Sequence, residues 1–263
     1  MRKLISLSPA VAESFSELTG KSGPEWFCTH DPVDQRLGSG GGTVHLLREA
    51  WLADGQEKSF TDWLESEQGI IIHAGGQSRR LPSYAAEGKA LIPVPVLRWS
   101  LGQRIDQTLL DLQTPFLERV MSAASSESRW MIVSGDVMLE SENLPGNLPE
   151  ADVVCLGIWG EPEQASRHGV FFTPRNDPSE LSFMLQKPGL EEIRQRSQHH
   201  YFLLDVGVWL FSNRAMRILL ERSGGTGPSS RKATLKEFDL YGAFGPAMGL
   251  NPHIQDPEIN QLK

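Results

Sequence analysis

Residues 69–76 read GIIIHAGG, a run of β-branched residues that ends in two glycines. A continuous apolar run of this length predicts a strand that is buried on both faces, as the strands of a parallel sheet are. Similar runs occur at 131–133, 153–158 and 206–211. Helical candidates lie between or after them, at 108–124 and 212–222. This alternation predicts an α/β fold with a mostly parallel central sheet.

The two ends of the chain have weaker patterns. Residues 1–22 predict a polar helical segment, and residues 25–29 predict a short strand. A helix is expected at 43–52, where apolar residues recur at a helical spacing. Residues 251–263 are polar and weakly patterned, so we expect a C-terminal tail there, or the start of a further region of a larger protein.

The composition narrows the classes of function. The formal net charge of -8 disfavours a broad nucleic-acid surface, because such surfaces need extended patches of Lys and Arg. No apolar run approaches the ~20 residues of a membrane span and no signal peptide is visible, so a cytoplasmic protein without a membrane partner is expected. Cys28 and Cys155 lie far apart, without the spacing of a zinc site or a disulfide framework.

Glycines and cations follow the apolar run at 69–74. Gly75 and Gly76 allow the backbone to approach a phosphate closely, with N–H groups exposed to it. Arg79 and Arg80 add guanidinium groups that match phosphate oxygens, and Lys89 adds a compact cation. The alternative is a tight turn followed by solvated arginines. The position of all these groups after a buried strand favours a phosphate site, because open α/β sheets bind ligands at that edge.

A second glycine segment precedes the predicted helix at 43–52. Its residues are Gly38, Ser39, Gly40, Gly41, Gly42 and Thr43. With Thr43 as the N-cap of the helix, this loop is expected to bind a phosphate group, such as that of a nucleotide, at the helix terminus. A flexible linker is the alternative interpretation.

The segment from Ala74 to Lys89 resembles the nucleotide-binding signature of nucleoside-diphosphate-sugar pyrophosphorylases, Ala-Gly-Gly-x-Gly-x-Arg-Leu followed by a lysine. Ser78 and Arg79 stand where that signature has glycine and threonine. Later motifs resemble those of the family in the same order: Val133-Ser134-Gly135-Asp136, His168-Gly169-Val170, Gln186-Lys187-Pro188 and Asp205-Val206-Gly207. The segments at 36–43, 73–82 and 110–113 narrow the resemblance to the fucose-1-phosphate guanylyltransferase (GDP-fucose pyrophosphorylase) domain, including that of bifunctional bacterial fucokinase enzymes.

This resemblance implies a Rossmann-like fold of the GT-A type, with a mixed, mostly parallel sheet and helices on both faces. It implies that residues 1–250 are a nucleotidyltransferase domain that transfers GMP from GTP to L-fucose 1-phosphate, giving GDP-L-fucose and pyrophosphate. In related proteins such a domain continues into a β-helical region and sometimes a kinase. Base and sugar rest on the resemblance alone.

The resemblance also implies roles for individual residues. Arg80 and Lys89 would hold the triphosphate, and Lys187 would hold the sugar phosphate. The sugar would contact His168, Gly169 and Asp205. Asp136 would bind Mg²⁺, for which an aspartate at the end of a buried strand is suited. A second metal carboxylate is expected, with Asp239 as the first choice and Asp205 as the next. The alternatives are that Asp239 caps an element or faces solvent, and that Asp205 caps a strand end.

Three alternatives stay open. One is a sugar-1-phosphate nucleotidyltransferase with another base or sugar. A GT-A glycosyltransferase would need an Asp-x-Asp pair, and the strand end at Gly135-Asp136-Val137-Met138 has one aspartate. The third is a non-catalytic nucleotide-binding fragment.

Overall fold

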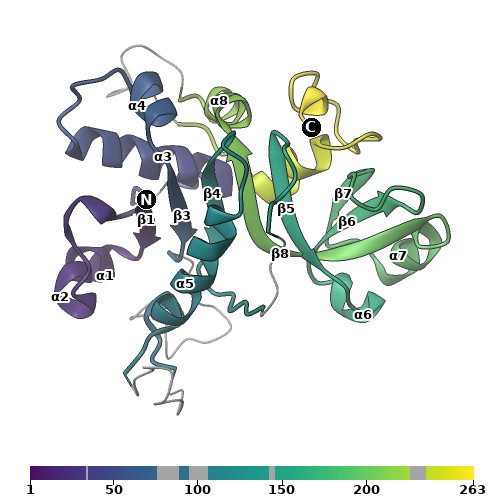
Figure 1. Cartoon of the computed structure of the whole chain (residues 1–263), viewed down its shortest axis with the longest axis horizontal. Helices are drawn as coiled ribbons and strands as arrows, with labels where there is room; N and C mark the ends of the chain where they lie inside the picture. The colour runs from purple at the N-terminus through teal and green to yellow at the C-terminus, as the bar shows by residue number, and fades with distance from the viewer. Residues whose placement is uncertain (34, 76–88, 95–105, 142–145, 226–234) are drawn as a thin grey trace. The chain divides into compact units, whose positions relative to one another are not determined.

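Four parallel strands form the sheet of the first of two units into which the chain divides. The computed structural model describes residues 1–33, 35–75, 89–94, 106–141, 146–225 and 235–263 (Figure 1). The first unit comprises Met1–Gln35 and His45–Glu150, and the second comprises Arg36–Val44 and Ala151–Lys263. Within the described parts of the chain, no helix is long and apolar enough to cross a membrane.

The sheet of the first unit has the strand order β2-β1-β3-β4. Its strands are β1 (Arg2–Leu7), β2 (Trp26–His30), β3 (Gly69–His73) and β4 (Ser128–Ser134), and each neighbouring pair is parallel. Ile70, Ile71 and Ile72 are at most 1% exposed, as expected for a strand covered on both faces. The predicted strands at 25–29, 69–74 and 131–133 are confirmed.

The prediction of a helical segment over 1–22 is wrong for its first residues, which form β1. Arg2 and Lys3 interrupt the apolar pattern in the sequence, and this hides the strand. In the structure the ammonium of Lys3 is buried and pairs with the carboxylates of Glu25 and Glu118, the latter at 2.6 Å. These partners compensate the buried charge, so a lysine is tolerated inside the sheet.

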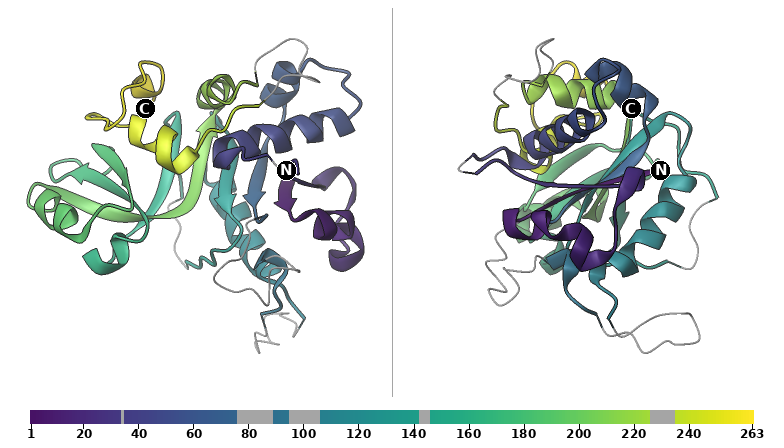
Figure 2. Two further views of the ribbon diagram at one scale, coloured as in Figure 1. Left: turned by 180° about the vertical axis from the view of Figure 1, so that it is seen from behind. Right: turned by 90° about the vertical axis from the view of Figure 1, so that its left-hand side faces the viewer.

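Helices of the first unit are α1 (Pro9–Glu13), α2 (Phe15–Thr19), α4 (Phe60–Ser66) and α5 (Leu109–Ser122). α5 confirms the helix predicted at 108–124. It begins with a capping box, in which Thr108 and Asp111 satisfy each other's backbone N–H groups. Figure 2 shows α5 beside the strands of this unit, and its apolar face includes the buried Leu110 and Phe116.

Strands of the second unit pair antiparallel. They are β5 (Val153–Ile158), β6 (Gly169–Pro174), β7 (Phe183–Gln186) and β8 (His200–Ser212). β8 pairs with both β5 and β6, and β7 pairs with β6. The predicted strands at 153–158 and 206–211 exist, but their expected parallel pairing is wrong, because an apolar run indicates burial and not direction. The α/β class, with parallel and antiparallel pairs, is confirmed.

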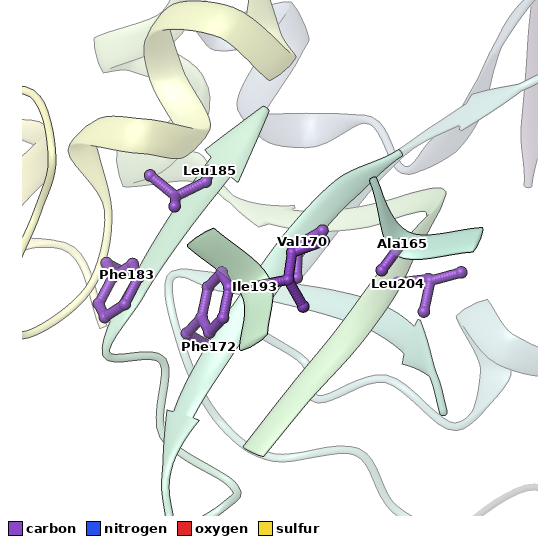
Figure 3. Close-up of a cluster of buried hydrophobic side chains, with 7 residues drawn as sticks. All are labelled: Ala165, Val170, Phe172, Phe183, Leu185, Ile193 and Leu204. Atoms are coloured by element: carbon purple, nitrogen blue, oxygen red, sulfur yellow. The ribbon is translucent and has the colours of Figure 1, made fainter. Parts of the chain in front are cut away.

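A buried apolar cluster lies between the strands and helices of the second unit (Figure 3). Its members are Ala165, Val170, Phe172, Phe183, Leu185, Ile193 and Leu204. They join β6, β7 and β8 to the short helices α6 (Pro162–Ala165) and α7 (Leu190–Arg196). α8 (Asn213–Arg222) confirms the helix predicted at 212–222.

Residues 251–263 belong to the second unit. Arg222 of α8 makes two hydrogen bonds to the carboxylate of Asp256, at 2.6 and 2.7 Å. Ile259 is buried, and the Val153 N–H donates to the Lys263 carbonyl at 2.9 Å. This segment, expected to be a polar tail, therefore makes specific contacts with α8 and β5.

The helix predicted at 43–52 is α3, but it begins earlier and spans Gly38–Ala53. The Phe238 carbonyl accepts the N–H groups of Gly40 and Gly41, at 2.9 and 3.2 Å, and so caps the additional turn. Thr43 lies inside the helix, fully buried, and its hydroxyl donates to the Ser39 carbonyl at 2.9 Å. The prediction of Thr43 as the N-cap is therefore wrong.

Candidate functional site

The carboxyl ends of β3 and β4 are joined closely in the first unit. The Gly135 N–H donates to the His73 carbonyl at 2.8 Å. A Cβ on Gly135 would lie 2.7 Å from the Cβ of Ala74, so only glycine fits at this position. Asp136 follows directly, at the edge of the sheet where α/β proteins bind ligands.

Asp136 forms an ion pair with Lys89 across this edge. The Lys89 ammonium lies 2.5 Å from Oδ2 of Asp136, and the Ser134 hydroxyl donates to Oδ1 at 2.7 Å. Burial raises the pKa of Asp136, but the hydrogen bonds from Lys89 and Ser134 and the charge of Lys89 outweigh it, so the pKa lies below its ordinary value. The carboxylate is therefore held in its ionised form.

Lys89 is anchored by its apolar neighbours. It begins a short 3-10 turn, η3 (Lys89–Leu91), in which Ala90 and Leu91 are buried. The Leu109 N–H donates to the Ile92 carbonyl at 3.0 Å, which ties this turn to the start of α5. Two predicted site residues, Lys89 and Asp136, are thus brought together by separate elements of one unit.

The surroundings of Asp136 fit a magnesium ion that is shared with a substrate. Mg²⁺ prefers oxygen ligands and often takes one or two protein carboxylates together with phosphate oxygens. Among the residues that the structure describes, no group of three or more His, Cys, Asp or Glu side chains is placed to hold a metal. The Mg²⁺ expected from the sequence stays a prediction.

Part of the predicted phosphate site falls outside the described residues. This part includes Gly76, Arg79 and Arg80. Gly75 is described and exposed, and a Cβ there would lie 3.3 Å from the Leu7 carbonyl oxygen at the end of β1. Gly75 and Lys89 are thus the two members of this predicted site whose surroundings are known.

Four predicted residues lie close together in the second unit. Gly169, the first residue of β6, pairs with Gln186 of β7. The next residue, Lys187, donates its N–H to the His168 carbonyl at 2.9 Å. A Cβ on Gly169 would lie 2.6 Å from Cε of Met184 and 3.1 Å from Oδ2 of Asp205, so only glycine lets β6 pack this closely against the carboxylate. The residues predicted to bind the sugar phosphate are therefore neighbours in the fold.

Asp205 is a deeply buried carboxylate, with only 8% of the residue exposed. Its Oδ1 accepts the Gly207 N–H at 2.7 Å and the Trp209 indole N–H at 2.9 Å. Burial raises the pKa of Asp205, although these hydrogen bonds and the charge of His168 lower it in part. Among the described residues, Oδ2 has no hydrogen-bond donor. The group can therefore accept a hydrogen bond from a hydroxyl of a ligand.

Lys187 has an unusual backbone conformation. Its φ is 50°, in the left-handed region that non-glycine residues seldom adopt. For a residue with a side chain this conformation costs roughly 1–2 kcal/mol. Strain of this kind is concentrated at functional sites, where the surrounding structure holds it in place. The backbone geometry thus adds a structural observation to the motif on which the prediction for Lys187 was based.

Asp239 is held by residues of the predicted glycine segment. Its Oδ1 accepts the Ser39 hydroxyl at 2.8 Å and the Tyr241 N–H at 3.0 Å. Gly38, Gly40 and Gly41 lie against the backbone of residues 236–238, with added Cβ atoms at 2.5, 3.1 and 2.8 Å from its carbonyl oxygens. Asp239 and Asp136 belong to different units, so the pairing of these two carboxylates around one metal stays a prediction.

Sequence reasoning missed the contacts by which polar groups hold the predicted aspartates, including that of Ser39, which was predicted to bind the nucleotide. Ser134 supports Asp136, Trp209 supports Asp205, and Ser39 supports Asp239. The first two lie within a few residues of the aspartate that they contact, so their spacing is a signal that the sequence contains. Ser39 and Asp239 are distant in sequence, and only the fold reveals their contact.

Comparisons with known proteins support the same group of enzymes as the motifs. Residues 61–255 match the family model described as the fucose pyrophosphorylase domain. An "L-fucokinase/L-fucose-1-P guanylyltransferase" of Bacteroides fragilis is 49% identical over 262 residues, which cover 100% of this chain and 27% of the relative. A "Bifunctional fucokinase/GDP-fucose pyrophosphorylase" of Arabidopsis thaliana is 25% identical over 238 residues, covering 80% of this chain and 22% of the relative. The chain thus spans about a quarter of the length of these curated relatives.

Proposed function

This chain belongs to the fucose pyrophosphorylase domain family, and from this premise we propose that it transfers GMP from GTP to L-fucose 1-phosphate. The products would be GDP-L-fucose and pyrophosphate. The names of both relatives support the sugar and the guanine nucleotide. The observation that carries the chemistry is the ion pair of Lys89 and Asp136 at the strand ends of a parallel sheet.

The proposed reaction is a single displacement at phosphorus. A phosphate oxygen of the sugar phosphate attacks the α-phosphorus of GTP, the bond from that phosphorus to the β-phosphate breaks, and pyrophosphate leaves with the electron pair. Both substrates are anions, so the main tasks of the protein are to align them and to compensate negative charge. Lys89, together with Arg80, would compensate the charge that develops on the leaving pyrophosphate.

Asp136 would hold a magnesium ion in the first unit, and Asp239 is the carboxylate of the second unit for which we propose the role of a metal ligand. When bound, the ion would supply positive charge to the phosphate oxygens. Because the pKa of Asp136 is lowered, the carboxylate is ionised at neutral pH and needs no deprotonation before it binds a cation. Ser134 keeps one of its oxygens in place.

The second unit would bind the sugar phosphate. Lys187 would contact its phosphate, while His168, Gly169 and Asp205 would contact the sugar. Oδ2 of Asp205 is suited to accept a hydrogen bond from a sugar hydroxyl, and Gly169 lies directly beside this carboxylate. In the longer relatives a fucokinase accompanies this activity, and we propose that kinase action on fucose supplies the sugar phosphate here as well.

Pyrophosphate release, measured over a matrix of nucleoside triphosphates and sugar 1-phosphates, tests this function. We expect the highest rate with GTP and L-fucose 1-phosphate, and a requirement for Mg²⁺ that Asp136→Asn removes together with most of the activity. A preference for another pair would reassign the base or the sugar. No release with any pair would leave a non-catalytic nucleotide-binding domain, and transfer of fucose from GDP-fucose to an acceptor would show a glycosyltransferase.

A further inference from the structure

The glycine segment at the start of α3 is built around the segment that carries Asp239. Side chains at Gly38 and Gly41 would overlap the carbonyl oxygens of Phe238 and Lys236, since the added Cβ atoms would lie 2.5 and 2.8 Å from them. In return, the Phe238 N–H donates to the Leu37 carbonyl at 2.9 Å. The glycines therefore allow two backbones to pack at a distance that no larger residue permits.

The N–H groups that would bind a phosphate at this helix terminus already have a partner. Gly40 and Gly41 both donate to the Phe238 carbonyl. Free N–H groups are what make a helix N-terminus an anion site, so this feature argues against direct phosphate binding by these two residues. The segment performs a different task in this structure, which is to hold the backbone just before Asp239.

Ser39 extends this contact to the side chain of Asp239. Its hydroxyl donates to Oδ1 of Asp239 at 2.8 Å and accepts the Leu240 N–H at 2.8 Å, so both of its hydrogen-bonding directions are fixed. The Tyr241 N–H also donates to Oδ1, whereas no described residue donates to Oδ2. Asp239 is exposed, and the positive end of the 16-residue helix α3 favours its negative charge.

We propose that Ser39 is a positioning residue for Asp239: it fixes one carboxylate oxygen and leaves the other directed to a divalent cation. This inference rests on the proposed function, in which Asp239 is a metal ligand. It changes the role of the glycine segment, from a nucleotide cradle to a support for the metal carboxylate. Groups that hold a metal ligand in this way commonly change metal affinity by about 10- to 100-fold when they are removed.

The test compares Mn²⁺ binding in matched variants of the chain. Ser39→Ala removes the hydroxyl, and Ser39→Thr keeps it. Ser59→Ala is the control, because the Ser59 hydroxyl donates to the Asp62 carboxylate at 2.6 Å and accepts its N–H at 3.1 Å, the same pattern at an exposed helix start. Free Mn²⁺ is measured by electron paramagnetic resonance, with a GTP analogue that does not react, and nucleotide binding is measured separately without metal.

We expect Ser39→Ala to weaken Mn²⁺ binding about 10-fold or more. Ser39→Thr and Ser59→Ala should bind Mn²⁺ as the unmodified protein does, and Asp239→Asn should weaken binding at least as much as Ser39→Ala. Nucleotide affinity without metal should not change in Ser39→Ala.

Three results would overturn the positioning role: unchanged Mn²⁺ binding in Ser39→Ala, unchanged binding in Asp239→Asn, or a loss of metal-free nucleotide affinity in Ser39→Ala. A loss of metal-free nucleotide affinity would show that Ser39 binds the nucleotide directly. Failure of the unmodified protein to release pyrophosphate would contradict the proposed function alone, because the Mn²⁺ measurement does not depend on turnover.

Discussion

Asp136 in the first unit has 41% of its side chain exposed, whereas Asp205 in the second unit is buried, and their pKa values shift in opposite directions. Asp136 contacts the Lys89 ammonium and the Ser134 hydroxyl, and its pKa is lowered. Asp205 is bonded by neutral N–H groups in a deeper position, and burial raises its pKa. The depth of burial and the charge of the hydrogen-bond donor thus act together: the exposed Asp136 has a cationic donor, and the buried Asp205 has only neutral ones.

This difference matches the two roles proposed for the carboxylates. A group that stays ionised is suited to a cation and to charged phosphates. A buried group with less favourable ionisation is suited to the neutral hydroxyls of a sugar. Three experiments test this difference between the two units.

The largest effect is expected from Lys89→Ala. Removing the cation that compensates the phosphate charge should lower kcat/KM by about 10²- to 10³-fold, as loss of a single charge-stabilising donor does elsewhere. The change in kcat/KM is measured as pyrophosphate release from GTP with L-fucose 1-phosphate. Lys58→Ala is the control, because Lys58 is exposed and contacts the Ser66 hydroxyl. Turnover close to normal in folded Lys89→Ala would remove Lys89 from the phosphate site.

An intermediate effect is expected on the pH dependence of stability. The raised pKa of Asp205 means that the folded state holds this proton more tightly than the unfolded chain, so its contribution is present below the ordinary pKa of 3.8 and is lost as the pH rises through the raised value. For Asp136 the sign is opposite: its contribution is present above 3.8 and is lost as the pH falls through the lowered value.

Denaturant unfolding of Asp205→Asn and Asp136→Asn at a series of pH values measures the contribution of each aspartate to stability. Relative to the unmodified protein, Asp205→Asn should gain stability as the pH rises, because asparagine keeps an oxygen for Gly207 and Trp209 without the buried charge. Asp136→Asn should be destabilised, relative to the unmodified protein, and this loss of stability should be smallest at acid pH. For the buried Asp205, each unit of pKa shift corresponds to about 1.4 kcal/mol at full effect. The effect per unit is smaller for Asp136, because solvent screens its 41% exposed side chain. Parallel pH curves for the two variants would show that the aspartates do not differ as described.

The smallest effect is expected at Lys187. Because its φ is 50°, glycine should fit this backbone better than alanine, and Lys187→Gly should be more stable than Lys187→Ala by about 1 kcal/mol. Both variants lack the ammonium, so both should raise the KM for the sugar phosphate equally. Urea unfolding and steady-state kinetics separate the two effects. Equal stability would show that the left-handed conformation causes no strain, and an unchanged KM would remove the charge from the sugar-phosphate site.

The parts of the fold that could be predicted from the sequence are those with strong local patterns. The run from Gly69 to His73 is apolar throughout, and α5 combines helical spacing with a capping residue at Thr108. β1 was missed because Lys3 interrupts its pattern, and the carboxylates that compensate this lysine come from distant parts of the chain. The antiparallel pairing of β5 with β8 was missed because burial carries no information on strand direction.

In the candidate site too, local motifs identify some residues, whereas other contacts are visible only in the fold. The motifs around Asp136, His168, Lys187 and Asp205 placed these residues in groups, and the structure brings Lys89 to Asp136 and Lys187 to His168. Their catalytic and binding roles stay predictions. The sequence predicts a loop for the glycine segment, because glycines disfavour helices. In the structure the segment is helical, and its N–H groups are capped by the carbonyl of Phe238, which is distant in sequence. Contacts of this kind depend on tertiary structure and leave no local signal.

The ion pair at the strand ends also links two binding events. Lys89 and Asp136 compensate each other, so a cation that takes the aspartate leaves the lysine without its partner, and an anion that takes the lysine leaves the aspartate without its own. When the cation and the anion bind together, the ion pair of Lys89 and Asp136 has to be separated only once. Cation and triphosphate should therefore each increase the affinity for the other by the same factor, because thermodynamic coupling between two ligands is reciprocal.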